Sequence, residues 1–465
     1  MSSSSSGAFR LGDIRGIYPD EINEDFVRDF AHAFVGQFGL VGRIATGRDM
    51  RDSSGSLQDA LNQTLSTIGI DVVDIGLCPT ELGYYTAGTG DFAASIVVTA
   101  SHNPSHYNGL KCVLRGGHGI THETGLDAIR DRMSAGYRHS LASGSLTRED
   151  YHSRYLDFLS QHFSPDLLHG NIALNGLNGT AATMAGTIVE AFSLDATWFR
   201  ELPGPMPPDG ADPANPALAA EMQGFMADDK FRLGVAWDGD CDRCVFFDGE
   251  GQLVPTYYIV GLLAASFLEK NPGSAIVFDT KLCWNTIDII SAGGGKPVPA
   301  ETGHAFMKQK MQESGAIYGG ELSSHHYFGD FFGCDSGMFA WLTVFRILSE
   351  RDTPIADLIE GYRQRVCCTH EISLSLSDVD AAIDAVLHRF SASAVEIDRF
   401  DGVGITMPGD WRFSLKRSKT EPVVRINFEA RDTPDNLLNE GSAVFNVLEE
   451  WRIDDEDWLA GFVIQ

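Results

Sequence analysis

LGVAWDGDCDR, at residues 233–243, is the most informative segment of the chain for its fold. Five apolar residues end here in a polar loop, which is typical of a buried strand. The same pattern, a short apolar run that stops at a polar loop, occurs in four other segments. They are residues 43–46 (RIAT), 95–99 (SIVVT), 171–174 (NIAL) and 275–278 (AIVF). The sequence therefore predicts several buried strands, each followed by a polar loop.

Segments with helical spacing lie between these strands, at residues 26–36, 56–67 and 305–314. Strand, loop and helix in alternation indicate α/β units with mostly parallel sheets. In such sheets, ligands bind beyond the carboxyl ends of the strands. We therefore expect the polar loops that follow the strands to carry the chemistry of the protein.

The length of 465 residues corresponds to roughly three domains at ~150 residues each, so three or four are expected. Breaks in the pattern fall near residues 134–153, 253–258 and 366–372. The last hundred residues alternate in short segments, which favours a smaller α+β unit. We predict α/β domains with mixed or parallel sheets at 1–145, 146–255 and 256–368, and an α+β domain at 369–465.

The composition excludes several classes of protein. With 35 Lys and Arg against 64 Asp and Glu, the net charge of −29 repels nucleic acid and anionic lipid. Eight cysteines are too few for a disulfide scaffold. The start, MSSSSSGAFRLG, lacks the features of a signal peptide, and the apolar stretch at 257–268 is too short to span a bilayer. We expect a reduced, cytoplasmic protein without nucleic-acid or membrane partners.

Three carboxylates alternate in the loop that follows the strand at 233–237: Asp238, Asp240 and Asp242. If their oxygens converge they repel one another, so they require a cation. Oxygen-only ligands select a hard ion such as Mg²⁺ over zinc. A solvated acidic turn is the alternative interpretation. Arg243 favours the metal site, because a guanidinium beside the metal suits a bound phosphate.

A second loop, Thr99-Ala100-Ser101-His102-Asn103-Pro104, follows the strand at 95–99. A hydrolase with Ser101 as nucleophile is one interpretation, but the G-x-S-x-G elbow is missing. A plain turn is another. The density of polar groups, with Lys111 ten residues further on, favours a functional loop.

Two later loops are also rich in polar groups. In Gly319-Gly320-Glu321-Leu322-Ser323-Ser324-His325, the carboxylate and hydroxyl suit vicinal hydroxyls, although a Glu and a His in a loop are more often structural than catalytic. Lys416-Arg417-Ser418-Lys419-Thr420-Glu421-Pro422-Val423-Val424-Arg425 collects cations and hydroxyls in an acidic chain, which indicates an anion pocket. Further polar segments are Asp13-Ile14-Arg15-Gly16, residues 47–54, Lys281, and Glu301-Thr302-Gly303-His304.

Together these loops resemble the α-D-phosphohexomutase family. Its motifs T-A-S-H-N-P, D-G-D-x-D-R and G-E-x-S-x-H occur in full, and R-x-S-x-T-E-P-x-x-R matches except at Lys416. The early D-I-R-G fits as well, and all motifs keep the family's order. The resemblance covers essentially the whole chain and implies four domains around a central cleft. Cys241 stands where the family often has Gly, Ser324 where Gly is usual, and Lys419 where an amide residue occurs.

The resemblance implies a phosphohexomutase. Phosphorylated Ser101 would give its phosphoryl group to the free hydroxyl of a hexose phosphate, and the bound 1,6-bisphosphate would turn and return the other phosphate. The implied cofactors are Mg²⁺, with Ser101 and the three aspartates as ligands, and hexose 1,6-bisphosphate as activator. The end of the sugar loop at His325 and the segment 302–306 resemble the branch of bacterial phosphomannomutases that supply GDP-mannose.

The same resemblance assigns roles to individual residues. Lys111 and His325 are candidate general bases, with Arg15 and His102 nearby, and Arg243 draws charge from the transferring group. The implied sugar-phosphate contacts are Lys281, Gly303, His304, Glu321, Ser323 and His325. The implied distal phosphate pocket is Lys416, Arg417, Ser418, Thr420 and Arg425.

Several alternatives stay open. Within the family they are a phosphoglucomutase, a dual-specificity enzyme and a phosphoglucosamine mutase. Outside it they are a Mg²⁺-dependent sugar phosphatase and a non-catalytic sugar-phosphate binding protein. Either a monomer or a homodimer is expected, with small sugar phosphates as partners.

Overall fold

The computed structural model describes residues 5–140, 142–207, 210–227, 230–418, 423–431, 434–453, 458 and 462–464. These residues fall into two compact units. The first comprises residues 1–254, 303–319 and 323–355, and the second comprises 255–302, 320–322 and 356–465. Each unit is described by itself.

The first sheet of the first unit has the strand order β1-β5-β4-β2-β3-β7, with β6 paired to β5. Strands β2, β3, β4 and β7 run parallel, and β5 is antiparallel to its neighbours β1 and β4. The strands are β1 (Ile14–Ile17), β2 (Gly42–Arg48), β3 (Ile70–Leu77), β4 (Ala94–Val98), β5 (Tyr107–Leu114), β6 (His118–Gly119) and β7 (Leu146–Arg148).

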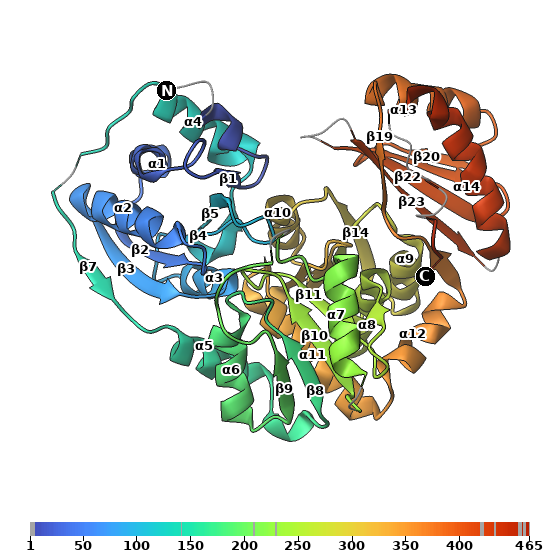
Figure 1. Cartoon of the computed structure of the whole chain (residues 1–465), viewed down its shortest axis with the longest axis horizontal. Helices are drawn as coiled ribbons and strands as arrows, with labels where there is room; N and C mark the ends of the chain where they lie inside the picture. The colour runs from blue at the N-terminus through green and yellow to red at the C-terminus, as the bar shows by residue number, and fades with distance from the viewer. Residues whose placement is uncertain are drawn as a thin grey trace. The chain divides into compact units, whose positions relative to one another are not determined.

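Four helices accompany this sheet: α1 (Glu24–Phe38), α2 (Ser54–Thr67), α3 (Thr80–Gly88) and α4 (Asp127–Ser134). Helices α1, α2 and α4 pack together over one face, and their apolar side chains join those of the strands in one core (Figure 1). Local sequence sets the ends of α1. The Asn23 side chain accepts from the Phe26 N–H at the N-terminus, and Gly39 ends the helix in the left-handed conformation.

The second sheet has the order β12-β11-β10-β8-β9. Its strands are β8 (Ile172–Asn175), β9 (Ala196–Phe199), β10 (Leu233–Trp237), β11 (Cys244–Phe247) and β12 (Leu253–Val254). Its helices are α5 (His152–His162), α6 (Ala181–Phe192) and α7 (Pro216–Met226). Every residue of β10 is buried. This confirms the strand predicted from LGVAW and places the carboxylate loop at its carboxyl end.

The remainder of the first unit contains α10 (His304–Ser314), the antiparallel pair β16 (His326–Phe328) and β17 (Cys334–Asp335), and α11 (Gly337–Arg351). The chain passes into the second unit within β15 (Tyr318–Gly320). Short helical turns lie at η1 (Ser5–Ala8), η2 (Arg115–Gly117), η3 (His122–Leu126), η4 (Pro165–Leu167), η5 (Gly329–Phe331) and η6 (Glu449–Trp451).

The second unit begins with α8 (Thr256–Lys270), the parallel pair β13 (Ala275–Asp279) and β14 (Lys296–Ala300), and α9 (Trp284–Ala292). After α12 (Ile355–Arg363) comes a largely antiparallel sheet with the order β18-β23-β22-β21-β20, in which β19 also pairs with β23. Its strands are β18 (Val366–Cys368), β19 (Ile372–Ser375), β20 (Glu396–Asp398), β21 (Val403–Met407), β22 (Trp411–Arg417) and β23 (Val423–Arg431). Helices α13 (Val379–Phe390) and α14 (Pro434–Leu448) complete it.

The predicted fold class is confirmed, with α/β units of mixed sheets and an α+β unit at the end of the chain. One detail differs, because the polar stretch expected to be a linker contains β7, which pairs with β3. The division at residues 145, 255 and 368 stays a prediction. Among the described residues, no helix combines the length and apolar character needed to cross a bilayer.

Candidate active site

Ser101 lies in the loop between β4 and β5 and is completely buried. Its Oγ donates to Asp238 Oδ2 at 2.6 Å, and His102 Nδ1 lies 3.2 Å from the same Oγ. Its backbone φ is +53°, which non-glycine residues adopt at a cost. The surrounding structure therefore holds Ser101 in an unusual conformation with its hydroxyl against the carboxylate loop.

The carboxylate loop brings its three acids together. One oxygen from each of Asp238, Asp240 and Asp242 lies within 4.8 Å of the others, and all three side chains are fully buried. The loop packs backbone to backbone on the serine loop, since a Cβ at Gly239 would lie 2.7 Å from the carbonyl oxygen of Ser101. Glycine is therefore required at this position.

These carboxylates fit Mg²⁺. Asp240 Oδ1 and Asp242 Oδ1 are buried oxygens with no hydrogen-bond partner, which is the condition that a hard cation relieves. The donor set contains only oxygen, and neither Cys241 nor Cys244 belongs to it. The chemistry of the group therefore favours Mg²⁺ over zinc.

Two cations face the three acids. Lys111, on β5, pairs with Asp240 Oδ2 at 2.7 Å and with Asp242. Arg243 Nε lies 3.8 Å from Asp238 Oδ2. Burial alone would lower the pKa of Lys111, but the charges of Asp240 and Asp242 outweigh it and raise that pKa. Lys111 is therefore an ammonium group in this state.

The acids differ in their response to these neighbours. Burial, with the charges of Asp242 and Asp240, raises the pKa of Asp238 well above its usual range. Burial acts in the same direction on Asp242, but Lys111 and His325 outweigh it and lower the pKa of Asp242 well below its usual range. Asp242 is thus the ionised partner of the cations, and an added positive charge would favour ionisation of Asp238.

His325 joins the same cluster. It forms a β-bridge with Arg243, and its Nε2 lies 3.5 Å from Asp242 Oδ1. On the other side, its Nδ1 lies 2.8 Å from Ser323 Oγ. The imidazole is therefore held between a carboxylate and a hydroxyl, an arrangement that fixes its orientation.

Arg15 and His304 also lie in the first unit. Arg15 donates to Asn103 Oδ1 at 2.5 Å and to Asp13 Oδ2 at 2.7 Å, which ties β1 to the serine loop. His304 follows Gly303 at the start of α10, and its Nε2 lies 3.9 Å from Asp13 Oδ2. The structure thus links these predicted residues through Asp13.

Two departures from the family pattern have a backbone consequence. Cys241 has a φ of +65° and Ser324 a φ of +69°, which is the left-handed region that favours glycine. Both positions are ones where the family has Gly, and here a side chain is accommodated. Neither residue is among the predicted ligands.

The predicted sugar and phosphate contacts of the second unit gather around carboxylates. Lys281 Nζ donates to Glu371 Oε2 at 2.9 Å, and Arg425 Nη1 lies 3.5 Å from Glu371 Oε1. Lys416 Nζ donates to Asp401 Oδ2 at 2.5 Å. Lys281 and Arg425 therefore share one acid, Glu371, and Lys416 has another, Asp401. The sequence patterns singled out neither acid, and the phosphate pocket stays a prediction.

Arg417 behaves differently from Lys416. The two neighbours point to opposite sides of β22, and Arg417 pairs with Asp380 on α13, with 57% of its side chain exposed. The Ser418 N–H donates to the Val423 carbonyl oxygen at 2.8 Å. Thr420 lies outside the described residues.

Glu321 lies near a further buried acid of the second unit. The Leu322 N–H donates to Asp279 Oδ2 at 2.9 Å, so the end of β13 fixes the sugar loop. Burial is the main cause that raises the pKa of Asp279 to about 6, and the charge of Glu321 adds to it. Sequence reasoning missed Asp279, although its place directly after an apolar strand was a signal.

Glu81, at the start of α3, is a buried carboxyl behind the carboxylate loop. Ser336 Oγ and the Met338 N–H donate to its Oε2, and the preceding residue, Thr80, donates through Oγ1 to Asp240 Oδ2 at 2.7 Å. Burial raises the pKa of Glu81 to about 8. The folded protein therefore holds a proton on this carboxyl that the unfolded chain releases above its ordinary pKa near 4.5.

We expect this proton to make stability fall as the pH rises. Because the native state binds more protons between the two pKa values, the free energy of unfolding should fall through that window by at most about 1.4 kcal/mol per pH unit, and level off above about pH 8. Glu81→Gln should remove this component. The melting temperature of the variant minus that of the wild type should therefore increase from pH 5 to pH 8. A constant difference would contradict the assignment.

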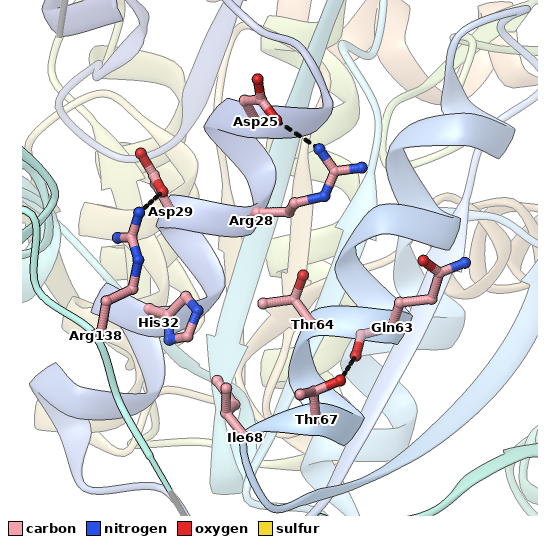
Figure 2. Close-up of a pocket in the computed structure, with 9 residues that line it drawn as sticks. All are labelled: Asp25, Arg28, Asp29, His32, Gln63, Thr64, Thr67, Ile68 and Arg138. Carbon is pink, nitrogen blue, oxygen red and sulfur yellow. Dashed lines mark hydrogen bonds and ion pairs between the residues drawn. The ribbon is translucent and has the colours of Figure 1, made fainter.

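A surface pocket of about 620 Å³ lies apart from this site, on the outer side of α1 and α2 (Figure 2). Its cations are already paired, since Arg28 contacts Asp25 at 2.6 Å and Arg138 contacts Asp29 at 2.7 Å. None of its lining residues is among the predicted site residues. The pocket therefore does not alter the assignment of the site.

Two family models match the chain. Residues 6–139 match the model described as "Phosphoglucomutase/phosphomannomutase, alpha/beta/alpha domain I". Residues 255–365 match the model described as domain III of the same family. The first match contains Ser101 and Lys111, and the second contains Lys281 and the sugar loop.

Two relatives match over nearly the whole chain. "Phosphohexose mutases" of Xanthomonas campestris pv. campestris is 38% identical over 95% of this chain and 99% of its own length. "Phosphomannomutase" of Escherichia coli K12 is 38% identical over 92% of this chain and 95% of its own length. A crystal structure of a phosphoglucomutase/phosphomannomutase family protein from Burkholderia thailandensis, 28% identical, matches all of both chains with a TM-score of 0.87.

Proposed function

Because the chain belongs to the α-D-phosphohexomutase family and is most like its bacterial phosphomannomutases, we propose that it interconverts mannose 6-phosphate and mannose 1-phosphate. Enzymes of this family are isomerases that transfer a phosphoryl group within a sugar phosphate. The proposal includes a supply role for GDP-mannose and a cytoplasmic location. Its carrying observation is the contact between Ser101 Oγ and Asp238 inside a cluster of three buried acids and two cations.

Ser101 is the proposed phosphoryl carrier. In the first half-reaction, the bond between phosphorus and Ser101 Oγ breaks as the free hydroxyl of the bound hexose phosphate forms a new one. Arg243 stabilises the charge on the moving group, and Ser101 leaves as an oxyanion close to the cations. In the second half-reaction, the 1,6-bisphosphate has turned, and Ser101 Oγ attacks its other phosphorus. The bond from that phosphorus to the sugar oxygen breaks, and the sugar oxygen takes the proton back from the base.

Asp238, Asp240 and Asp242 are the residues that would hold Mg²⁺ together with the phosphate on Ser101. The ion would supply positive charge next to the phosphoryl oxygens. The buried oxygens without hydrogen-bond partners support this assignment.

A base must accept the proton of the attacking hydroxyl, and Lys111 and His325 are the candidates. The raised pKa of Lys111 favours His325, because an ammonium group cannot accept a proton. His325 is also oriented by Asp242 and Ser323 on its two sides. A pH profile of kcat/KM for His325→Ala, compared with that of Lys111→Ala, separates the two.

The second unit supplies the proposed distal phosphate pocket, which binds the phosphate that is not transferred. Of its implied residues Lys416, Arg417, Ser418, Thr420 and Arg425, we propose Lys416 and Arg425 as charged contacts, and we add Lys281 because it shares Glu371 with Arg425. Burial opposes ionisation of Glu371, but Lys281 and Arg425 outweigh it and lower its pKa. The pocket therefore has an ionised carboxylate among its cations, and a dianionic phosphate must compete with that carboxylate for them. Glu321 and Ser323 are the proposed contacts of the sugar hydroxyls.

We expect Arg425→Ala to raise KM for mannose 1-phosphate and for mannose 6-phosphate alike, since each presents its phosphate to this pocket in turn. Loss of a charged hydrogen bond costs about 1.5–3 kcal/mol, so the increase should be on the order of tenfold to a hundredfold. Arg431→Ala, on the same strand but paired with Asp288, is the matched control. An increase for only one of the two substrates would argue against a shared pocket.

A coupled assay with mannose 1-phosphate, glucose 1-phosphate and glucosamine 1-phosphate tests the proposed substrate, with hexose 1,6-bisphosphate added as activator. Mannose and glucose phosphates differ only at the 2-hydroxyl, so some glucose turnover is expected beside a preference for mannose. A strict preference for glucose would replace the assignment by phosphoglucomutase. Release of inorganic phosphate without isomerisation would indicate the sugar phosphatase.

A further inference from the structure

Residues 47–54 run from the end of β2 to the start of α2 and had no role assigned from the sequence beyond their charge. Arg51 is the central residue of this segment, and only 1% of its side chain is exposed. Buried arginines are rare unless they are fully paired. The pairing of Arg51 is therefore informative about its role.

Every N–H group of the Arg51 guanidinium has an acceptor. Nη2 donates to the carbonyl oxygens of Ser101 at 2.8 Å and Asn103 at 2.6 Å. Nη1 donates to those of Pro104 at 2.7 Å and Tyr107 at 2.9 Å. Nε donates to Asp49 Oδ2 at 3.0 Å. Three of the five hydrogen bonds thus end on backbone carbonyls of the loop that carries Ser101, and a fourth ends on the carbonyl of Tyr107, the first residue of β5.

Asp49 anchors the arginine to the sheet. Its Oδ1 accepts from the Arg51 N–H at 3.0 Å and from Ser54 Oγ at 2.5 Å, and its own N–H donates to the Val98 carbonyl oxygen at 2.9 Å. Asn108 Nδ2 donates to Ser54 Oγ at 3.0 Å, where the loop returns into β5. The ends of β2, β4 and β5 and the serine loop therefore form one hydrogen-bonded network.

We propose that Arg51 is a positioning residue for phosphoryl transfer, which holds the loop at 101–107 so that Ser101 Oγ faces the carboxylate cluster. The inference rests on the proposed function, since positioning matters only if Ser101 carries the phosphoryl group. The left-handed conformation of Ser101 costs on the order of 1–3 kcal/mol and persists only where neighbouring contacts hold it. Arg51 contacts the carbonyl of Ser101 itself and is placed to impose it.

Lysine cannot replace this contact set. An ammonium group has three donors on one nitrogen, whereas the planar guanidinium reaches four carbonyls and a carboxylate at once. Arg51→Lys keeps the positive charge but removes the planar guanidinium, so it tests whether the hydrogen bonds to the loop matter apart from the charge. Because a displacement of ~1 Å at reacting groups costs about a hundredfold in rate, we expect kcat to fall by that order.

The test compares Arg51→Lys with Arg48→Lys as a matched control. Arg48 lies on β2, and its Nη1 donates to the Asp49 carbonyl oxygen rather than to a carbonyl of the serine loop. The expected result for Arg51→Lys is a kcat about a hundredfold lower with KM for mannose 1-phosphate changed by less than threefold. Arg51→Ala should regain activity with millimolar guanidinium ion. An unchanged kcat in folded Arg51→Lys, or a rise in KM alone, would overturn the proposal.

A second variant and a measurement without activity test the proposal if Arg51→Lys does not fold. If Arg51→Lys does not fold, Asp49→Asn, which has the same shape, should lower kcat at least tenfold at constant KM, and an unchanged kcat there would overturn the proposal. Hydrogen–deuterium exchange of the peptide at 99–109 reads the loop without any activity. Exchange should be faster in Arg51→Lys than in wild type, and unchanged exchange would overturn the positioning role. If the wild type isomerises no sugar phosphate, the proposed function fails, and the exchange experiment still decides whether Arg51 holds the loop.

Discussion

Ser101→Ala should lose mutase turnover by several orders of magnitude and still bind sugar phosphate. The serine hydroxyl is the proposed carrier of the transferring group, and removal of a covalent nucleophile leaves only binding and electrostatic stabilisation. Ser101 is buried, and it is the side chain of this loop that contacts Asp238. The measurement is kcat in the coupled assay, with binding of mannose 1-phosphate followed by calorimetry.

Ser105→Ala is the matched control, because Ser105 lies exposed in the same loop. It should retain kcat within about twofold, as surface substitutions away from special features do. Near-normal activity of a well-folded Ser101→Ala protein would remove the phosphoserine mechanism.

Removal of the metal should have the second largest effect. EDTA should abolish activity and Mg²⁺ should restore it, because the two charges of Lys111 and Arg243 do not balance three buried carboxylates and a phosphorylated serine, so a further cation is needed. Asp240→Asn should lower kcat by at least a hundredfold at saturating Mg²⁺, since it weakens the ligand set and the pairing with Lys111.

Asp166→Asn, an exposed acid on a short helical turn, serves as the control and should behave as wild type. Restoration by zinc but not by Mg²⁺ would contradict the assignment and would direct attention to Cys241 or Cys244. Full activity in EDTA would remove the metal from the mechanism.

The site residues that lie in loops directly after a strand could be predicted from the sequence. Apolar runs that end in polar loops mark both the strand and its carboxyl end, so β10 with its acids and β4 with Ser101 were predicted together. The resemblance of the motifs then placed Lys111, His325 and Arg243 around them. The structure brings these residues of the first unit into one cluster.

Other features carry no local pattern. Glu371 and Asp401 became recognisable as partners of Lys281 and Lys416 only through long-range contacts. Strand β7 has exposed side chains throughout, so no apolar alternation marked it. Arg51 was visible as a charge, but its four carbonyl contacts depend on how a loop fifty residues later returns beside it.

The left-handed backbone at Cys241 and Ser324 could not be predicted from local sequence either. Conformation with positive φ is signalled in a sequence mainly by glycine, and here other residues occupy both positions. Only the family pattern, in which glycine is frequent at these places, pointed to them.

The most direct test of the central claim is the mass of the wild-type protein after incubation with hexose 1,6-bisphosphate and Mg²⁺, followed by peptide mapping. We predict the gain of one phosphoryl group, located on Ser101. If that group is isotopically labelled and the excess bisphosphate is removed, added mannose 1-phosphate or mannose 6-phosphate should take up the label while Ser101 stays phosphorylated. A protein that gains no phosphoryl group, or that carries it on another residue while remaining active, would contradict the account.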